Sequence, residues 1–240
     1  MNQKKIIIVG ASSGIGYDIA SKYVSKGHMV GITGRRNNLL NELKEKFPTQ
    51  IFIACFDVTK NENEQQIVQL INSLGGLDLL IYNAGFGELS LNLKWEVENE
   101  IVKTNVNGFT EIVVYAFNYF AQQGFGHIAV TSSIAALRGN SWSPAYSASK
   151  AFISNYAEAL SVKAWRMKKN ICVTDIKPGF IDTKMAKGDR KFWVSSSQKA
   201  AEQIIVAIQK KKRIVYITKR WWLIAQFMKF MPYAIYKRLA

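Results

Sequence analysis

Cysteine, histidine and proline are scarce in this sequence. Its 240 residues include 2 Cys, 2 His and 4 Pro. Two cysteines are too few for a disulfide framework, and because Cys55 and Cys172 each lie in an apolar run, we expect two buried, reduced thiols. The histidines, His28 and His127, have no acidic or cysteine partner at ligand spacing, so the sequence predicts no metal site.

Long hydrophobic runs are also missing. No stretch reaches the ~18 uncharged apolar residues that a membrane-spanning helix needs. The N-terminal sequence MNQKKIIIVG has a basic start, but its apolar run ends at Gly10 and is too short for the core of a signal peptide. Reduced thiols and the lack of an export signal together predict a cytoplasmic protein.

Acidic residues are few relative to basic ones. Lys and Arg total 32 against 17 Asp and Glu, which gives a formal net charge of +15. Such a surplus predicts an anionic partner, which can be nucleic acid, a membrane surface or a phosphorylated ligand. Because the chain has no basic–aromatic RNA motif and no recognition helix, we expect no nucleic-acid partner.

What the chain does contain is a regular alternation of strand-like and helix-like apolar segments. The expected strands are 5–9, 29–33, 51–56, 77–82, 127–132, 171–176 and 213–218. The expected helices are 15–25, 39–47, 62–74, 95–120, 144–168 and 197–209. This order predicts an α/β fold, a doubly wound parallel sheet with helices on both faces, in one domain over residues 1–218. Residues 219–240 follow as a basic, aromatic C-terminal segment.

A glycine-rich loop connects the first expected strand to the first expected helix. It contains Gly10, Ser12, Ser13, Gly14, Ile15 and Gly16. Glycines at such a junction allow a tight turn and let the backbone approach a pyrophosphate, which lies at the positive end of the helix dipole. The pattern therefore predicts a dinucleotide site, with a plain tight turn as the alternative.

The end of the second strand distinguishes between two dinucleotides. A fold that prefers NAD usually has Asp or Glu here, whereas this chain has Arg35 and Arg36. A guanidinium can hold a 2′-phosphate through charge-assisted hydrogen bonds, so the sequence predicts NADP(H); a solvated basic pair is the alternative. Further candidate cofactor contacts follow the third and fourth strands, namely Asp57, Val58, Asn83, Ala84 and Gly85.

Tyr146 and Lys150 are candidates for the chemistry. They are four residues apart on an expected helix and therefore share a face. A nearby ammonium favours the phenolate and is expected to lower the pKa of the phenol, which makes Tyr146 a plausible general acid for a carbonyl oxygen. Ser133 ends the preceding strand and can hold the same oxygen, while Asn105 lies in the helix before that strand. Taken alone, a tyrosine and a lysine at this spacing are common on protein surfaces.

The order and spacing of these motifs resemble the short-chain dehydrogenase/reductase family over about residues 4–218. The matching motifs are Gly10-x3-Gly14-x-Gly16, Asn83-Ala84-Gly85, Asn105, Ser133, Tyr146-x3-Lys150 and Pro178-Gly179. The resemblance implies a Rossmann-like sheet of about seven strands and a catalytic tetrad. In it, Tyr146 is the acid/base, Ser133 polarises the carbonyl, Lys150 holds the nicotinamide ribose and tunes Tyr146, and Asn105 holds a water in a proton relay. It also implies nicotinamide contacts from Pro178, Gly179, Ile181 and Thr183.

The C-terminal segment departs from the family, many of whose members end in a short tail that packs a tetramer. After Glu202 the chain has nine Lys or Arg and no acidic residue. At helical spacing one broad apolar side contains Leu223, Ile224, Phe227, Met228, Phe230, Met231 and Ile235. The opposite side contains Trp222, Gln226, Lys229, Tyr233, Tyr236 and Lys237. Pro232 should end the first helix near Met231. Such a segment resembles an interfacial membrane helix; packing on a second subunit or on its own domain are the alternatives.

Together these features predict an NADPH-dependent carbonyl reductase acting on a small-molecule, lipophilic ketone or aldehyde. The candidate apolar walls of the substrate site are Phe86, Leu137, Trp142, Phe180, Met185, Phe192 and Trp193. One alternative is an NAD(P)-linked alcohol or hydroxysteroid-type dehydrogenase running in the oxidative direction, and another is a non-catalytic NADP-binding regulatory module. We expect a homodimer or homotetramer that contacts the inner face of an anionic membrane through residues 219–240.

Overall fold

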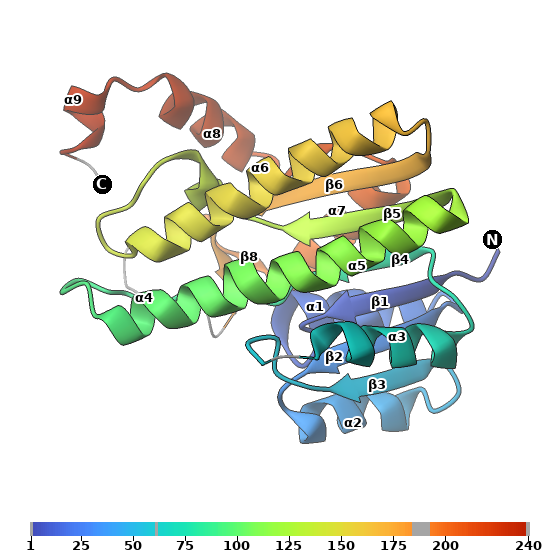
Figure 1. Ribbon diagram of the computed structural model, residues 1–240. Helices are drawn as coiled ribbons and strands as arrows, with labels where there is room; N and C mark the ends of the chain where they lie inside the picture. Colours follow the sequence, from blue (N-terminus) through green and yellow to red (C-terminus); the bar gives the residue numbers. More distant parts are fainter. Residues whose placement is uncertain (1, 61, 184–192, 239–240) are drawn as a thin grey trace.

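The computed structural model describes residues 2–60, 62–183 and 193–238 and has a parallel sheet at its centre (Figure 1). Its seven strands are β1 (Lys5–Val9), β2 (Met29–Gly34), β3 (Ile51–Cys55), β4 (Leu79–Tyr82), β5 (Phe125–Thr131), β6 (Asn170–Pro178) and β9 (Ile214–Ile217). They are ordered β3-β2-β1-β4-β5-β6-β9, and every pairing is parallel. The predicted doubly wound sheet is confirmed.

Helices cover both faces of the sheet because successive strand residues point to opposite sides. Ile6 and Ile8 of β1 belong to one core, which α1 (Gly14–Val24), α2 (Asn37–Lys46) and α7 (Ser197–Gln209) cover. Ile7 and Val9 belong to a second core, beneath α3 (Asn63–Leu74), α5 (Gly108–Gln123) and α6 (Pro144–Arg166). Burial on both faces explains why these strands are continuously apolar.

The strand order reverses between β1 and β4. Chain connections leave the carboxyl ends of these two strands in opposite directions, which opens a crevice there. The glycine loop after β1 and residues 83–87 after β4 flank this crevice. The fold therefore brings the candidate phosphate loop and the candidate catalytic residues after β5 to one edge of the sheet.

Two local features differ from expectation. Cys55 is exposed rather than buried, because it ends β3, the edge strand of the sheet; Cys172 is partly buried. The expected long helix over 95–120 is divided into α4 (Trp95–Val102), a π-helical turn η1 (Lys103–Asn107) and α5. π-Helical turns often occur at functional sites, and this one carries Asn105.

The C-terminal segment forms α8 (Trp221–Phe230) and α9 (Tyr233–Tyr236), at the end of the molecule toward which the strands point (Figure 1). Met231 has extended backbone, as expected for a residue before proline, so the predicted break is confirmed. Helix α8 packs against η2 (Ile134–Leu137). Arg138 Nη1 donates to the carbonyls of Met228 at 3.1 Å and Met231 at 2.9 Å, which satisfies acceptors that the helix end leaves open.

The predicted apolar side of the C-terminal segment mostly faces away from the body of the protein. The residues buried against the body of the protein are Trp221, Ala225 and Met231. Most of the predicted apolar side is exposed, including Phe227 and Phe230. The helix turns a narrow stripe of its surface to the domain, and the wider remainder faces outward. Among the described residues, no helix has the length and apolarity needed to cross a bilayer.

Candidate functional site

The glycine loop folds tightly between β1 and α1. Gly10 and Gly14 have φ values of +86° and +58°, a backbone region that residues with a Cβ rarely adopt. A Cβ on Gly10 would lie 2.6 Å from the backbone of Ala84. The loop after β1 and the loop after β4 therefore touch, and Asn83 Nδ2 adds a hydrogen bond to Gly10 O at 3.2 Å.

Asn83 also connects this loop to the next strand. Its Oδ1 accepts a hydrogen bond from Thr131 Oγ1 at 3.2 Å, and Thr131 ends β5. The carbonyl oxygen of Thr131 in turn accepts from Lys150 Nζ at 2.9 Å. One chain of contacts thus runs from the glycine loop to the candidate catalytic lysine.

The structure separates the two arginines that follow β2. Arg36 Nη2 donates to both Ser12 Oγ and Ser13 Oγ at 2.7 Å, so its guanidinium lies over the glycine loop. Arg35 Nη1 lies 3.6 Å from Asp57 Oδ2. Burial favours a raised pKa for Asp57, but hydrogen bonds from Thr59 and the charge of Arg35 outweigh it, and the pKa is lowered.

Val58 is less accessible than the sequence suggested. It packs against the core on the α5 side of the sheet, and its carbonyl oxygen accepts from Asn63 Nδ2 at 3.0 Å. A Cβ on Gly108 of α5 would lie 2.3 Å from the same oxygen. The carbonyl is thus used in joining β3 to α3 and α5.

Ser133, Tyr146 and Lys150 lie together at the carboxyl end of β5. The side chain of Ser133 faces the Tyr146 phenol and acts to lower its pKa. Lys150 is 4% exposed, and its Nζ is 5.7 Å from the centroid of the Tyr146 ring. Gly85 faces the same cluster, since a Cβ there would be 3.3 Å from Lys150 Nζ and 3.5 Å from Asn105 Oδ1.

The titration of this cluster differs from expectation. Burial raises the pKa of Tyr146 and the side chain of Ser133 lowers it, with a net rise, so the expected lowering by Lys150 is wrong. Burial lowers the pKa of Lys150 to about 8, and the negative charge of Asp175 partly opposes this. The phenol therefore carries its proton at neutral pH, as a proton donor must.

Asn105 joins the π-helical turn to two other parts of the site. Its Oδ1 accepts from Phe86 N at 2.8 Å and its Nδ2 donates to Phe86 O at 2.8 Å, which fixes the loop after β4. The same Nδ2 donates to Ser149 Oγ at 2.9 Å, next to Lys150 on α6. The side chain is therefore a structural link, and its expected part in a proton relay stays a prediction.

The residues after β6 complete the crevice. Pro178 ends β6, and Gly179 N donates to Ile217 O at 2.6 Å. Ile181 is buried and begins a short strand, β7 (Ile181–Asp182), that pairs with β8 (Ser195–Ser196). A Cβ on Gly14 would lie 3.2 Å from Thr183 Cγ2, which brings Thr183 over the glycine loop.

Trp221 of α8 is the largest side chain at the candidate site that was not predicted from the sequence. Its ring lies against Gly179, where a Cβ would come within 2.1 Å. Two predicted walls meet it: the ring centroid of Phe180 is 5.5 Å away and that of Trp193 is 6.1 Å away. The Trp221-Trp222 pair after β9 was the available signal, but the sequence did not show which indole turns inward.

The other predicted walls have different surroundings. Trp142 is exposed, and Leu137 lines an open hollow of about 400 Å³ beside α6 whose lining does not include Tyr146. Met185 and Phe192 lie outside the described residues. Gly87 was missed: a Cβ there would be 2.8 Å from the ring of Tyr146, so the second glycine after Asn83 gives this ring its space.

The chain belongs to the short-chain dehydrogenase family, whose model matches residues 4–193. It is 28% identical over 242 residues to an uncharacterized oxidoreductase of Mycobacterium tuberculosis, covering 96% of this chain and 94% of that protein. It is 32% identical over 192 residues to the 3-oxoacyl-[acyl-carrier-protein] reductase FabG of Chlamydia muridarum, covering 77% of each.

Solved structures of the family share the fold. A short-chain dehydrogenase from Streptomyces avermitilis has a TM-score of 0.81 at 22% identity, with 95% of this chain and 92% of that chain covered. A 3-ketoacyl-(acyl-carrier-protein) reductase from Brucella melitensis complexed with NADH and ElxO with NADP bound have TM-scores of 0.79 and 0.77. Their identities are 20% and 21%, and each covers 90% of this chain and 97% of its own. The chain is therefore an oxidoreductase of this family with its Rossmann-like fold.

The residues at the crevice fit a nicotinamide dinucleotide. The positive φ values of Gly10 and Gly14 and the close approach of Ala84 and Thr183 keep the loop free of bulky side chains, so its backbone can approach a pyrophosphate at the start of α1. The Arg36 guanidinium lies beside this space. Among residues 2–60, 62–183 and 193–238, no three His, Cys, Asp or Glu are grouped so that they could hold a metal ion.

Proposed function

We propose that the protein is an NADPH-dependent carbonyl reductase, and that residues 1–218 form its catalytic domain. The observation that carries this proposal is the grouping of Ser133 and Tyr146, with the buried Lys150 beside them, at the edge of the sheet where the glycine loop lies. A proton donor and a second hydroxyl can thus act on one oxygen atom. This arrangement suits addition of a hydride and a proton to a carbonyl group.

Each of the four residues has a proposed role. NADPH, when bound, supplies the hydride. Tyr146 donates its proton to the carbonyl oxygen, and Ser133 donates a hydrogen bond to the same oxygen. Lys150 holds ribose hydroxyls through its ammonium group and stabilises the phenolate that Tyr146 becomes. Asn105 fixes the loop after β4 and supports the relay that returns a proton to Tyr146.

The remaining cofactor contacts follow the same proposal. The backbone of residues 10–16 takes the pyrophosphate, Asp57 and Val58 border the adenine, and residues 83–85 border the ribose. Pro178, Gly179, Ile181 and Thr183 border the nicotinamide. Arg36, held by Ser12 and Ser13, is the main partner of the 2′-phosphate, with Arg35 behind it. One related structure holds NADH and another NADP, so this chain's own arginines support the preference for NADPH.

The substrate is proposed to be lipophilic, because aromatic rings border the crevice. Phe180, Trp193 and Trp221 form one cluster next to Gly179. The test is NADPH oxidation by the full chain over a series of 2-alkanones and 3-keto esters of increasing chain length. We expect turnover that rises with chain length; equal rates at every length would contradict an apolar site.

Turnover with both cofactors tests the two other readings of the same fold. An NAD-linked alcohol dehydrogenase would oxidise secondary alcohols with NAD faster than it reduces ketones with NADPH. A regulatory module would bind NADPH without reducing any carbonyl in the series. We expect the chain to reduce ketones with NADPH, and to do so faster than it oxidises secondary alcohols with NAD.

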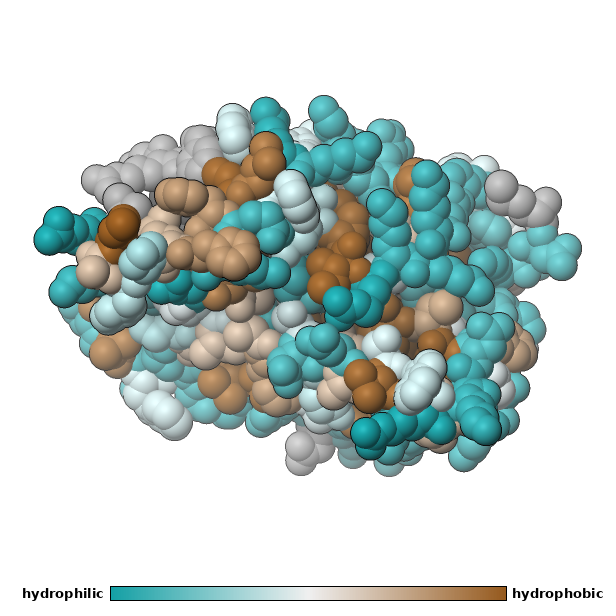
Figure 2. Space-filling view, turned by 90° about the horizontal axis from the view of Figure 1, so that it is seen from above, coloured by the Kyte–Doolittle hydropathy of each residue, from teal (hydrophilic) through white to brown (hydrophobic). Residues whose placement is uncertain are grey.

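We further propose that the C-terminal segment contacts an anionic membrane surface, at the cytoplasmic face. Trp222, Leu223, Phe227, Phe230, Tyr233 and Ile235 are at least half exposed. Seen from above, brown and tan residues gather at the end of the molecule that holds α8 and α9 (Figure 2). The charged side chains of the segment itself are all positive, since the chain has no acidic residue after Glu202. Apolar rings bordered by Lys and Arg suit anionic headgroups.

Vesicle co-sedimentation tests this contact. The variant Phe227→Ser/Phe230→Ser changes exposed rings only, and Phe125→Ser, at the start of β5, is the matched control. We expect the full chain and the control to sediment with vesicles of phosphatidylcholine and phosphatidylglycerol, and the double variant to stay in the supernatant. Equal sedimentation of all three would rule out contact through the C-terminal segment.

A homodimer or homotetramer is the proposed assembly. Helix α6 exposes Phe152, Val162 and Trp165, a run of apolar side chains along its outer face. Exposed apolar stretches of this kind mark protein contacts. Light scattering on Trp165→Ser and on the parent chain is the measurement, and a smaller particle for the variant is expected.

A further inference from the structure

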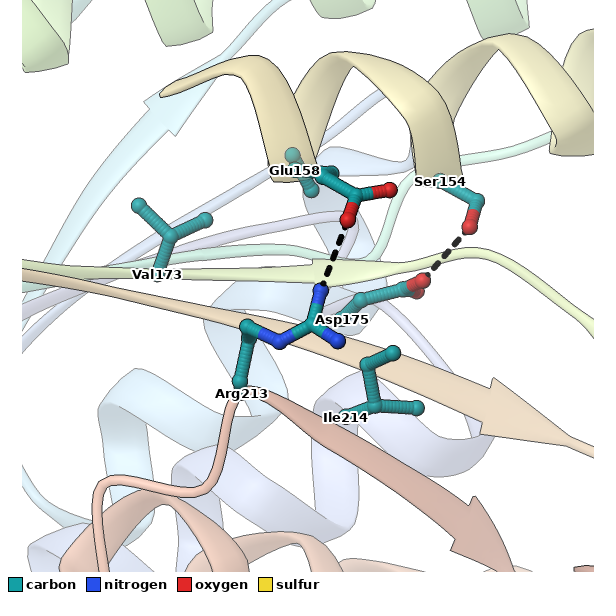
Figure 3. Close-up of a pocket in the computed structure, with 7 residues that line it drawn as sticks. Ser154, Glu158, Val173, Asp175, Arg213 and Ile214 are labelled. Carbon is teal, nitrogen blue, oxygen red and sulfur yellow. Dashed lines mark hydrogen bonds and ion pairs between the residues drawn. The ribbon is translucent and has the colours of Figure 1, made fainter. Parts of the chain in front are cut away.

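A buried pair of opposite charges lies behind the candidate catalytic helix. Asp175 and Lys177, both on β6, are 2.7 Å apart, and their side chains are 5% and 4% exposed. Asp175 Oδ1 accepts a hydrogen bond from Ser132 Oγ, and Oδ2 accepts from Ser154 Oγ at 2.7 Å, which Figure 3 shows. Lys177 Nζ also donates to Ser154 Oγ at 2.6 Å.

Charges at these positions are costly for stability. A strand in the interior of a parallel sheet is usually apolar on both faces, and burying an ion pair costs more desolvation than its attraction commonly returns. Apolar residues of similar size at 175 and 177 would give a core at least as stable. The pair therefore calls for a reason other than stability.

The carboxylate of Asp175 joins three segments that carry site residues. Ser132 immediately precedes Ser133 at the end of β5. Ser154 is one helical turn after Lys150 on α6, so both side chains lie on the same side of that helix. Lys177 immediately precedes Pro178 and Gly179. One acidic group thus bonds to a neighbour of each part of the site.

Asp175 also acts on Lys150 electrostatically. Its negative charge raises the pKa of the Lys150 ammonium, against the effect of burial. The titratable groups that act on or contact Lys150 are Tyr146 on its own helix and Asp175 from β6; Lys177 is paired with Asp175. Asp175 is the acidic group of these, so its removal leaves burial to favour the neutral amine of Lys150.

A small hollow of about 20 Å³ reaches the cluster from the surface (Figure 3). Asp175 and Ser154 line its inner side, and Glu158 and Arg213, 3.1 Å apart, line it further out. Each of the two side chains of this outer ion pair is more than half exposed. Glu158 is therefore a matched control: an acidic residue of the same hollow whose removal should change little.

We propose that Asp175 is a positioning residue, whose carboxylate aligns the segments that carry Ser133, Lys150 and Pro178 and places a negative charge behind the Lys150 ammonium. This inference rests on the proposed function for the role of Lys150. Its test uses the pH dependence of NADPH affinity as well as turnover. Affinity needs no carbonyl substrate, so a protein that binds NADPH yet reduces no ketone would refute the proposed function while still testing Asp175.

The first experiment compares the full chain with Asp175→Asn, Asp175→Glu and Glu158→Gln. In the parent chain, NADPH affinity and kcat should fall as pH rises through the pKa of Lys150, about 8. We expect Asp175→Asn to move the midpoints of the two pH profiles, NADPH affinity and kcat, by about one pH unit or more toward acid. Asp175→Glu should return both midpoints most of the way to the parent values. Glu158→Gln should give the parent profile. Equal profiles for Asp175→Asn and the parent chain would overturn the proposal.

A second variant separates positioning from stability. Asp175→Val/Lys177→Met replaces both charges with apolar side chains of similar size and leaves no unpaired ion, so it should unfold at a temperature close to that of the parent chain. We expect it to bind NADPH with the acid-shifted profile and to lose about tenfold or more in kcat at neutral pH. A stable double variant with the parent profile and parent kcat would mean that the pair has no part in the site, and would overturn the proposal.

Discussion

In β1 and β4 the side chains from Ile6 to Val9 and from Leu80 to Tyr82 have no exposed surface, whereas in α8 Phe227 is 66% exposed and Phe230 is 83% exposed. The body of the protein, residues 2–218, contains every described acidic residue, while the C-terminal segment is basic throughout. The same apolar residue types thus form a closed core in one region and an open surface in the other. Internal packing accounts for the first composition, and the proposed membrane contact would account for the second.

Three buried side chains join the two regions. Trp221, Ala225 and Met231 hold α8 to the body, and Trp221 lies against Gly179 beside the candidate nicotinamide contacts. Arg138, five residues after Ser133, holds the end of α8 through two carbonyl groups. Substitutions at these contacts should alter the candidate site, and substitutions on the outer surface of α8 should not.

The largest expected effect is on the chemistry of the body. Tyr146→Phe removes the proposed proton donor and keeps the ring that packs on Gly87. We expect kcat for ketone reduction to fall by about 10²–10⁴-fold, because general acid catalysis contributes that much. NADPH affinity and vesicle binding should stay at the parent values. Steady-state kinetics and a fluorescence titration are the measurements, and a variant with parent kcat would refute the role of Tyr146.

Next in size is the contrast between two adjacent indoles. Trp221 is 1% exposed and Trp222 is 51% exposed. We expect Trp221→Ala to lower the free energy of unfolding by about 3–5 kcal/mol, because it leaves a cavity against Gly179. Trp222→Ala should change it by about 0.5 kcal/mol or less. Urea denaturation compares them; similar losses for the two variants would contradict the described orientation of α8.

A smaller effect is expected from the two arginines of the body. Arg36→Ala should lower the preference for NADPH over NADH by about 10–100-fold, because a charge-assisted hydrogen bond is worth about 1.5–3 kcal/mol. Arg35→Ala should lower it less, since Arg35 is paired with Asp57. The ratio of kcat/KM for the two cofactors is the readout. A greater loss for Arg35→Ala would reverse the assignment.

The smallest effect concerns stability and pH. Lys150 has a folded-state pKa of about 8, below its unfolded value of 10.5. Between these values the unfolded chain binds more protons, so Lys150 makes stability rise with pH across this window. In Lys150→Met this rise should be absent. Denaturation of both chains at several pH values is the measurement, and identical slopes would contradict the burial of Lys150.

Much of the fold of residues 2–218 could be predicted because it follows from patterns between residues close together in the sequence. Continuous apolar strands, helical spacing and the glycine loop gave the sheet and the position of Tyr146 next to Lys150. Asn83, Ser133 and Gly179 followed from the family motifs, and the structure brings them to one edge. The order of the strands in the sheet could not be predicted from their spacing in the sequence. Cys55 is exposed because β3 is the edge strand.

The remainder depended on contacts between distant residues. Helical spacing predicts which residues of α8 share a side but not which side packs against the body of the protein. Burial of Trp221 was therefore not predicted, and the exposed Phe227 was placed on the same side as the buried Met231. The family resemblance assigns the basic residue of NADP(H)-preferring members to Arg35. The contacts of Arg36 with Ser12 and of Arg35 with Asp57 depend on tertiary structure, and they favour Arg36 instead. The raised pKa of Tyr146 follows from burial, which two residues at helical spacing do not determine.

The central claim is that this chain transfers hydride from NADPH to a carbonyl carbon with Tyr146 supplying the proton. The most direct test is to incubate the full chain with NADPH deuterated at the transferring position and a long-chain ketone, and to analyse the product by mass spectrometry. The account predicts an alcohol with one deuterium on the carbinol carbon for the parent chain and for Arg35→Ala, and almost none for Tyr146→Phe. An unlabelled product, or equal labelled product from Tyr146→Phe, would contradict it.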